Sequence, residues 1–173
     1  MEQDFKRAGI PVEVMPPTSM LGRGKLIKQL SQRLEKIHPD IVHTHLGGDV
    51  WGGKAAHRAS ERPWVMTAHS HEDDIPFRQR FGRKWAYANA DHIVAVSKSV
   101  ASAVERRYRF SRDRLSIIPV GLDLERFRRR DPGLPGDVPV IISIGRLVPE
   151  KGHETLIRAL ADIDRPFILK LVG

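Results

Sequence analysis

The sequence predicts an α/β fold in which parallel sheets are covered by helices on both faces. Short β-branched runs alternate with amphipathic stretches along the chain, which is typical of parallel strands joined by helical crossovers. Two runs, IVAV at 93–96 and VIISI at 140–144, are apolar at both alternating positions, as strands covered on both faces should be. A stretch near 128–138 combines charge, proline and glycine and interrupts the periodicity, which indicates a boundary between two domains.

Short apolar runs are expected to form the strands. In chain order they cover residues 10–15, 40–43, 64–67, 91–96, 115–119, 138–144 and 167–172. Helices are expected between most of these strands. The first covers 25–37, because Leu26, Leu30 and Leu34 recur at the spacing of one helix face.

Composition narrows the classes of protein. A chain of 173 residues, 40% hydrophobic, suits one domain with a core and part of a second. The absence of cysteine excludes disulfides, thiolate metal sites and cysteine catalysis. No apolar run approaches the roughly 20 residues that span a bilayer, and the first residues lack the apolar core of a signal peptide. We therefore expect a cytoplasmic protein whose net charge of +8 attracts anions.

The domain boundaries follow from the interruption in the pattern. We expect an N-terminal domain over 1–127, a linker over 128–137 and the start of a C-terminal domain over 138–173. The last segment holds only a strand, a helix and a strand, which cannot bury a sheet on both faces. The usual first strand and phosphate-binding turn of a doubly wound fold are also missing from the beginning. The pattern thus predicts a fragment whose N-terminal domain lacks its first strand and helix.

Two H-x-H pairs support an alternative function. On an extended backbone the two imidazoles of such a pair share one face and could chelate a divalent metal, as in hydrolases that activate a metal-bound water. The residues concerned are His43 with His45 and His69 with His71, and carboxylates at Asp49, Asp73 and Asp74 could complete a site. No further histidine or carboxylate pattern follows the later strands. A metal-dependent hydrolase therefore remains the alternative, and we assign no metal.

Basic stretches interleaved with aromatic residues support a second alternative, a non-catalytic module that binds an anionic surface. They are 106–114, 126–130 and a helix that carries Phe77, Phe81 and Trp85 among arginines. This composition suits an acidic membrane surface or nucleic acid. The same aromatic residues recur at i, i+4 and i+8, which is equally typical of a core stripe. We expect no nucleic-acid partner and keep peripheral contact with the inner face of the membrane as an open alternative.

Five ordered segments carry a family resemblance. They are PDIVHTH (39–45), WVMTAHSHEDD (64–74), ADHIVAVS (90–97), IPVGLDLERF (118–127) and ISIGRLVPEKG (142–152). In order and spacing they resemble the retaining glycosyltransferases with two Rossmann-like domains, the GT-B architecture of the glycogen-synthase-like and mannosyltransferase-like group (group 1, family 4 type). The resemblance implies a Rossmann-like parallel sheet and a nucleotide-sugar donor bound in the cleft between the domains. The acceptor, a glycan, a lipid-linked sugar or a small molecule, would be held mainly by the N-terminal domain.

The most specific segment is the Gly145-Arg146-Leu147-x-x-x-Lys151-Gly152 motif. Arg146 follows an expected strand and Lys151 begins the next helix, so both can reach the crevice at the carboxyl end of the sheet. A guanidinium and an ammonium there would stabilise the charge that develops on a leaving diphosphate without a metal ion. We therefore assign Arg146, Lys151 and Gly145 to donor diphosphate binding and expect no cofactor.

The resemblance also assigns residues on the acceptor side. His69 matches the family's histidine that faces the donor sugar and the acceptor, where an imidazole can donate a hydrogen bond near neutral pH. Ser97 matches a serine at the mouth of the cleft, although it is also a good N-cap for the helix that follows. Gly121 and Asp123 occupy the family's Pro-x-Gly-x-Asp turn, in which Val120 replaces the more usual asparagine.

The family's Gly-rich loop and its acidic E-x7-E segment are both absent from the sequence. The donor site is therefore incomplete, and we expect the 173-residue chain to be inactive alone. The parent enzyme would transfer a sugar with retention of configuration.

Overall fold

The computed structural model describes residues 2–15, 22–46, 48–59, 62–73, 75–125, 127 and 138–173. The chain divides into two compact units, Met1–Gly121 and Leu122–Gly173. The expected linker over 128–137 lies outside the described residues, so the boundaries of the domains expected over 1–127 and 138–173 stay a prediction.

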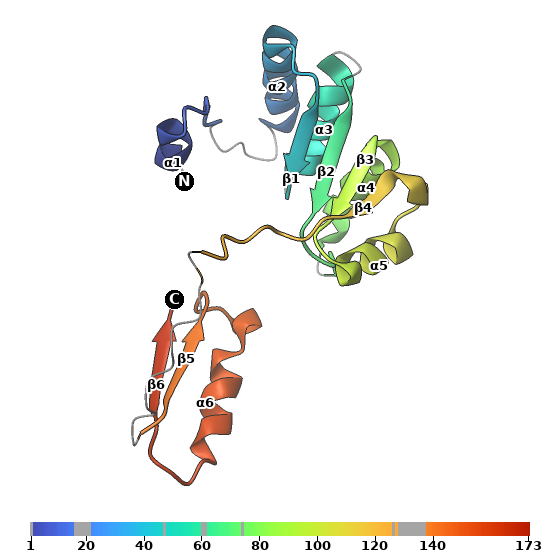
Figure 1. The fold of residues 1–173 in the computed structure, drawn as a ribbon. Helices are drawn as coiled ribbons and strands as arrows, with labels where there is room; N and C mark the ends of the chain where they lie inside the picture. The colour runs from blue at the N-terminus through green and yellow to red at the C-terminus, as the bar shows by residue number, and fades with distance from the viewer. Residues whose placement is uncertain are drawn as a thin grey trace. The chain divides into compact units, whose positions relative to one another are not determined.

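The first unit is built on a four-stranded parallel sheet (Figure 1). Its strands β1 (Val42–His45), β2 (Trp64–Ala68), β3 (His92–Ala95) and β4 (Leu115–Ile117) lie side by side in chain order. The crossovers contain α3 (Gly48–Ala59), α4 (Phe77–Asn89), α5 (Lys98–Arg107) and the short η2 (Arg112–Arg114), while α1 (Glu2–Arg7) and α2 (Arg23–Ile37) precede the sheet. This architecture confirms the α/β fold with a parallel sheet.

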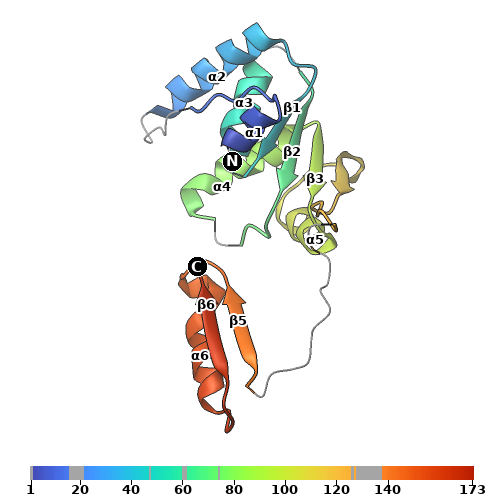
Figure 2. The same ribbon diagram turned by 60° about the vertical axis from the view of Figure 1, so that its left-hand side comes forward.

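The hydrophobic core lies between the sheet and the crossover helices. Figure 2 shows α3 and α4 beside the strands, and α2 packs against α3. The core cluster draws on β2, β3 and all three crossover helices, with Trp64, Met66, Ile93, Tyr87 and Val104 among its buried members. A Cβ atom on Gly53 of α3 would lie 2.1 Å from the Trp64 ring. Only glycine therefore lets α3 pack directly on this tryptophan.

The opposite face of the same sheet carries several polar side chains beside Val65 and Val94. Successive side chains of a strand point to opposite faces, and the strand register places His43, His45, Thr67, His92 and Ser116 away from the core. His43 Nε2 lies 2.8 Å from Thr67 Oγ1, and His92 Nε2 lies 2.9 Å from Ser116 Oγ. The sheet thus carries a row of hydrogen-bonded polar pairs on the face that leads to its carboxyl edge.

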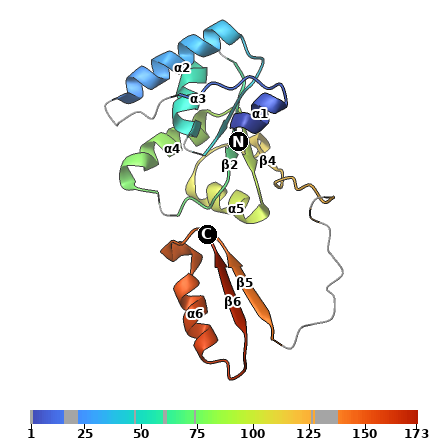
Figure 3. The ribbon, with the colours of Figure 1, turned by 90° about the vertical axis from the view of Figure 1, so that its left-hand side faces the viewer.

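The second unit contains one β-α-β element. Parallel strands β5 (Val140–Ile144) and β6 (Ile168–Val172) are joined through η3 (Pro149–Lys151) and α6 (His153–Ala161), which Figure 3 shows beside the two strands. Val140, Ile142 and Ile144 are exposed, and Ile144 retains 79% of its accessible surface. The expectation that VIISI is covered on both faces is therefore wrong within the described residues, because α6 covers only the face that carries Ser143.

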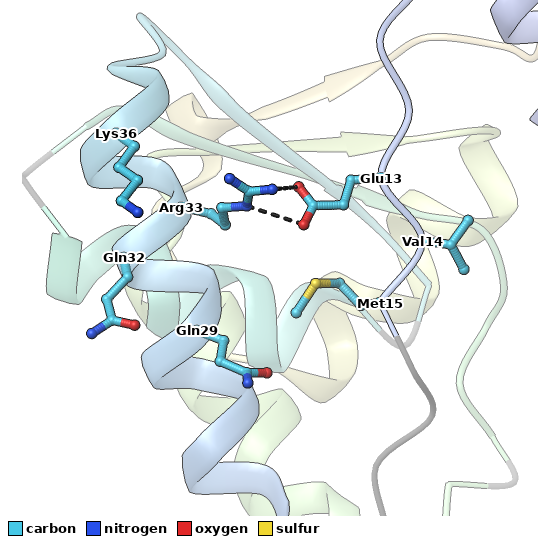
Figure 4. A pocket seen from close by; sticks show the side chains of 7 residues that line it. All are labelled: Glu13, Val14, Met15, Gln29, Gln32, Arg33 and Lys36. Atoms are coloured by element: carbon cyan, nitrogen blue, oxygen red, sulfur yellow. Dashed lines mark hydrogen bonds and ion pairs between the residues drawn. The ribbon is translucent and has the colours of Figure 1, made fainter.

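Residues 10–15 do not form the expected strand. The segment pairs with no described strand, and Val14 is 68% exposed. Instead, the Glu13 carboxylate forms a bidentate ion pair with Arg33 of α2 (Figure 4). Arg33 Nε lies 3.0 Å from Glu13 Oε1, and Arg33 Nη2 lies 2.6 Å from Glu13 Oε2. Alternating apolar residues form a strand only where a neighbouring backbone accepts their hydrogen bonds, and here a side-chain pair fixes the segment.

Two smaller expectations also change. The strand expected over 40–43 begins at Val42, whose N–H donates to Pro63 O at the start of the ladder. The stripe expected on α4 is only partly a core stripe: Phe77 and Phe81 are 70% and 69% exposed, whereas Trp85 packs against the core and stacks on Trp64. The core side of this helix is also supplied by Ala86 and Tyr87. Among the described residues, no helix is long and apolar enough to cross a bilayer.

Candidate functional site

Three histidines form a row at the carboxyl edge of the first sheet. His43 and His45 alternate along β1 with ring centroids 4.3 Å apart, so the first H-x-H pair shares a face as expected. His69 follows the last residue of β2 on the same face. Its Nε2 lies 2.9 Å from His45 Nδ1. The sequence-predicted catalytic histidine therefore stands in a hydrogen-bonded imidazole pair that is open to solvent.

The hydrogen bond between His45 and His69 limits where hydrogens can lie on the two rings. A hydrogen bond between two ring nitrogens requires one to donate N–H and the other to accept. If both rings were protonated, both nitrogens would carry hydrogen and the bond would be lost. Burial, followed by the neighbouring charges of His45 and His69, lowers the pKa of His43 below its usual 6.5. The row therefore favours neutral imidazole at its inner end, which can donate or accept hydrogen bonds to hydroxyl groups.

The two histidines of the second H-x-H pair, His69 and His71, contact different partners. His71 lies beyond the end of β2 and turns to α5, where its Nε2 lies 2.8 Å from Ser99 Oγ. Beside it is an open hollow of about 400 Å³ lined by Ser70, His71, Glu72, Asp73 and Ile75. The two histidines of this pair do not share a strand face, because the extended backbone ends at Ala68.

The structure does not support a metal-dependent hydrolase. Over the described residues, which exclude Asp74, no group of three histidines or carboxylates is arranged to hold a metal ion. Asp49 is buried and forms a 2.6 Å ion pair with Arg83. Asp73 accepts a 2.9 Å hydrogen bond from Arg107. Asp49 and Asp73, two of the three carboxylates expected to complete a site, therefore bind arginines instead.

In the second unit, the structure brings Gly145 and Lys151 together. The N–H of Gly145 donates to Val172 O at 2.8 Å, which extends the ladder of β5 with β6 by one residue. The stem of Lys151 passes 3.5 Å from the position of a Cβ atom on Gly145. The Arg146 side chain is exposed beside them, at the carboxyl end of β5. These neighbours present two cations at the edge of the sheet where we expected the diphosphate.

His153 is a residue that the sequence analysis missed. At the start of α6, its Nε2 lies 3.3 Å from Gly145 O and 3.1 Å from Arg146 O, and its Nδ1 lies 3.2 Å from Ser143 Oγ. The histidine thereby holds the backbone of the loop that presents Arg146. Its place directly after Lys151-Gly152, at the beginning of a helix, was the available signal.

The remaining predicted site residues have local structural roles. Ser97 caps α5, because its Oγ accepts the Val100 N–H at 3.1 Å, and this confirms the expected cap. Asp123 Oδ1 accepts the N–H of Glu125 at 3.1 Å in a turn, and Gly121 ends the first unit. The cleft roles of Ser97, Gly121 and Asp123 stay predictions.

Comparison with solved structures defines the class of protein. The structure of Anabaena HepE in complex with UDP and glucose matches 99% of this chain with a TM-score of 0.78 and 25% identity. Sucrose-phosphate synthase from Thermosynechococcus elongatus matches 94% of the chain with a TM-score of 0.75, and at 23% identity this likeness concerns the fold. The fold is that of the GT-B glycosyltransferases, as expected.

Sequence comparison gives the family. The model of Glycosyltransferase Family 4 matches residues 2–126, and the chain belongs to this family. Among its relatives, the D-inositol 3-phosphate glycosyltransferase of Nocardia farcinica is 29% identical over 94% of the chain, and that of Acidothermus cellulolyticus is 31% identical over 71%. The chain spans 39% and 32% of the length of these relatives, and half of the HepE chain.

Proposed function

We propose that the chain is part of a glycosyltransferase that moves a sugar from a nucleotide-sugar donor to an acceptor, with retention of configuration and without a metal ion. One observation carries the proposal: a Family 4 chain presents a solvent-open His45–His69 pair at the carboxyl edge of its parallel sheet. Ligands of open α/β sheets bind at this edge. The bound UDP and glucose of HepE favour a uridine diphosphate sugar as donor.

The donor's diphosphate would bind at the loop that carries Gly145, Arg146 and Lys151. Cleavage of the bond between sugar and phosphate leaves negative charge on the diphosphate. An arginine and a lysine beside the loop can stabilise this charge directly, so no metal is needed for it. His153 holds the Gly145 and Arg146 carbonyl groups, which keeps the loop in place before the donor arrives.

The acceptor would approach the first unit near His69. Because His45 and His69 share one hydrogen, the free nitrogens of the pair can donate to one hydroxyl and accept from another. The names of the relatives favour an acceptor of the inositol phosphate type. The net charge of +8 is compatible with an anionic acceptor.

A transfer assay tests this function. A form of the protein as long as its relatives, here called the whole protein, would be incubated with UDP-glucose and inositol phosphate. We expect a glycoside whose anomeric configuration, measured by NMR, matches that of the donor, at a rate unchanged by EDTA. Inversion at the anomeric carbon, or loss of activity with EDTA and its recovery with a divalent cation, would contradict the mechanism. The 173-residue chain alone is expected to show no turnover.

A specific observation also favours contact with an anionic lipid surface. Phe77 and Phe81 form an exposed edge-to-face pair on α4, with ring centroids 5.7 Å apart. Arg78 and Lys84 of the same helix are exposed, and the only acidic residue of α3 and α4 is the buried Asp49. Exposed aromatic rings among cations suit the cytoplasmic face of an acidic membrane.

Vesicle binding tests this contact. We expect the chain to sediment with vesicles that contain phosphatidylserine, and the double variant Phe77→Ser, Phe81→Ser to remain in solution. The matched control is Ile37→Ser, Ile41→Ser, which removes two apolar side chains that are 65% and 59% exposed elsewhere on the unit. Equal sedimentation of the chain and the phenylalanine variant would show that α4 does not contact the membrane.

A further inference from the structure

The loop between β2 and α4 is held at its middle by a buried carboxylate. Glu72 lies at φ +59°, a left-handed backbone conformation that is costly for a residue with a Cβ atom. Its side chain is only 4% exposed, although the histidines at positions 69 and 71 of the same loop are open to solvent. The surrounding structure must therefore impose both the conformation and the burial.

Two tyrosines donate to the Glu72 carboxylate. Tyr87 of α4 donates its hydroxyl to Oε1 at 3.2 Å, and Tyr108, the residue that ends α5, donates to Oε2 at 2.5 Å. Their rings stack with centroids 4.1 Å apart. Burial raises the pKa of both phenols, and the charge and hydrogen bonding of Glu72 raise it further. Both hydroxyls therefore stay protonated and act as donors to the Glu72 side chain.

Two arginines complete the attachment. Arg83 of α4 lies 3.5 Å from Glu72 Oε1 and is itself held by the buried Asp49 of α3 at 2.6 Å. Arg107 of α5 donates to the Glu72 carbonyl oxygen at 2.6 Å and to the Asp73 carboxylate. Side chains from α4 and from the end of α5 thus bind one residue of the loop, through its side chain and its main chain, and Asp49 of α3 holds Arg83 in turn.

Such a network is better suited to fixing geometry than to adding stability. Buried ion pairs often contribute little net free energy relative to apolar packing, whereas a buried hydrogen-bonded network can specify one arrangement of its members. Glu72 follows His69 by three residues and His71 by one. A shift of the Glu72 anchor would therefore move both histidines relative to their partners, His45 and Ser99.

We propose that Glu72 is a positioning residue: by fixing the middle of the β2–α4 loop on α4 and the end of α5, it sets the places of His69 and His71 at the sheet edge. Its importance for catalysis rests on the proposed function, in which His69 faces the substrates. Glu72 itself contacts no reacting atom in this account.

The test begins with the chain itself, by NMR of its histidine rings. In Glu72→Ala we expect the ring signals of His69 and His71 to shift and broaden, while those of His57, at the exposed end of α3, do not change. Tyr108→Phe removes one hydroxyl and should move the same signals less, and it serves if Glu72→Ala does not fold. Glu35→Gln, on the exposed side of α2, is the control and should move neither. Unmoved His69 and His71 signals in a folded variant would overturn the proposal.

Kinetics of the whole protein separate this proposal from the function on which it rests. Misplacing His69 should lower kcat by about 10- to 100-fold and leave the KM for the donor unchanged, because the donor's diphosphate binds elsewhere. Moved ring signals with an unchanged kcat would support the positioning by Glu72 and overturn the role of His69. Unmoved ring signals would overturn the positioning whatever the value of kcat.

Discussion

Two loops that follow parallel strands in this protein are fixed in opposite ways. The loop after β5 closes through its own backbone, with hydrogen bonds from Val148, Lys151 and Gly152 to carbonyl groups two or three residues earlier, and His153 adds contacts from the next helix. The loop after β2 is fixed at Glu72 by side chains from α4 and from the end of α5. Among its described residues, each loop contains one left-handed residue, which is Gly152 in the first and Glu72 in the second.

The difference shows where the conformation of each loop is encoded. Glycine adopts a positive φ without steric strain, so the loop after β5 needs few distant contacts. Glutamate does not, so the loop after β2 depends on buried charges. The proposed donor site is thus encoded locally, whereas the proposed acceptor site is encoded by residues far apart in the sequence.

The largest expected effect is the loss of stability when the buried cation Arg83 is removed. Arg83→Met leaves Asp49 and Glu72 without their shared cation, and breaking a buried pair in this way should lower the free energy of unfolding by about 3–5 kcal/mol. Urea unfolding of the chain, monitored by circular dichroism, measures the loss. Arg80→Met, which changes an exposed arginine of the same helix, is the control. A loss equal to that of the control would mean that the network does not hold the loop.

The second unit should lose less stability when the side chain of His153 is removed. His153→Ala removes neutral contacts to two carbonyl groups and one hydroxyl, so we expect about 1 kcal/mol of lost stability. Hydrogen exchange should accelerate at the amides of Gly145 and Val148 and remain unchanged in the first unit. A loss as large as that of Arg83→Met would contradict the contrast between a local and a distributed anchor.

The smallest effect concerns pH. The pKa of His43 is lowered in the folded state, so below the unfolded value of about 6.5 the unfolded chain binds the proton more readily. His43 therefore does not lower the stability of the folded state above that pH. As the pH falls below it, protonation of His43 in the unfolded chain reduces the free energy of unfolding. His43→Gln should flatten the dependence of the unfolding free energy between pH 7 and 5, whereas His57→Gln should not. If the unfolding free energy of His43→Gln depends on pH as steeply as that of the original chain, His43 is not the source of this dependence.

The same contrast explains what the sequence could predict. Strand-helix alternation gave the parallel sheet, and Gly145, Arg146 and Lys151 were found because the loop's chemistry lies within seven residues. Glu72 was missed because its partners, Arg83, Arg107 and Tyr108, are spread over α4 and the end of α5. No short-range pattern links such residues, since only the packing of the helices brings them together.

Two of the differences between the expected and the observed fold have a related cause. The periodicity of residues 10–15 is that of a strand, but pairing depends on a neighbouring backbone that sequence does not locate. The spacing of Phe77 and Phe81 correctly defines one face of a helix. It does not indicate which part of that face meets the core, and here Trp85 packs against the core whereas Phe77 and Phe81 face the solvent.

Kinetics of Arg146→Ala and Lys151→Ala in the whole protein test the central claim most directly. Each variant removes a charge that stabilises the leaving diphosphate, so we expect kcat to fall by about 10²- to 10³-fold. Arg165→Ala, at an exposed position of the same unit, is the control and should retain the original rate. Such losses would place the diphosphate at this loop. Near-unchanged rates in both variants would contradict the account and require another binding site for the donor.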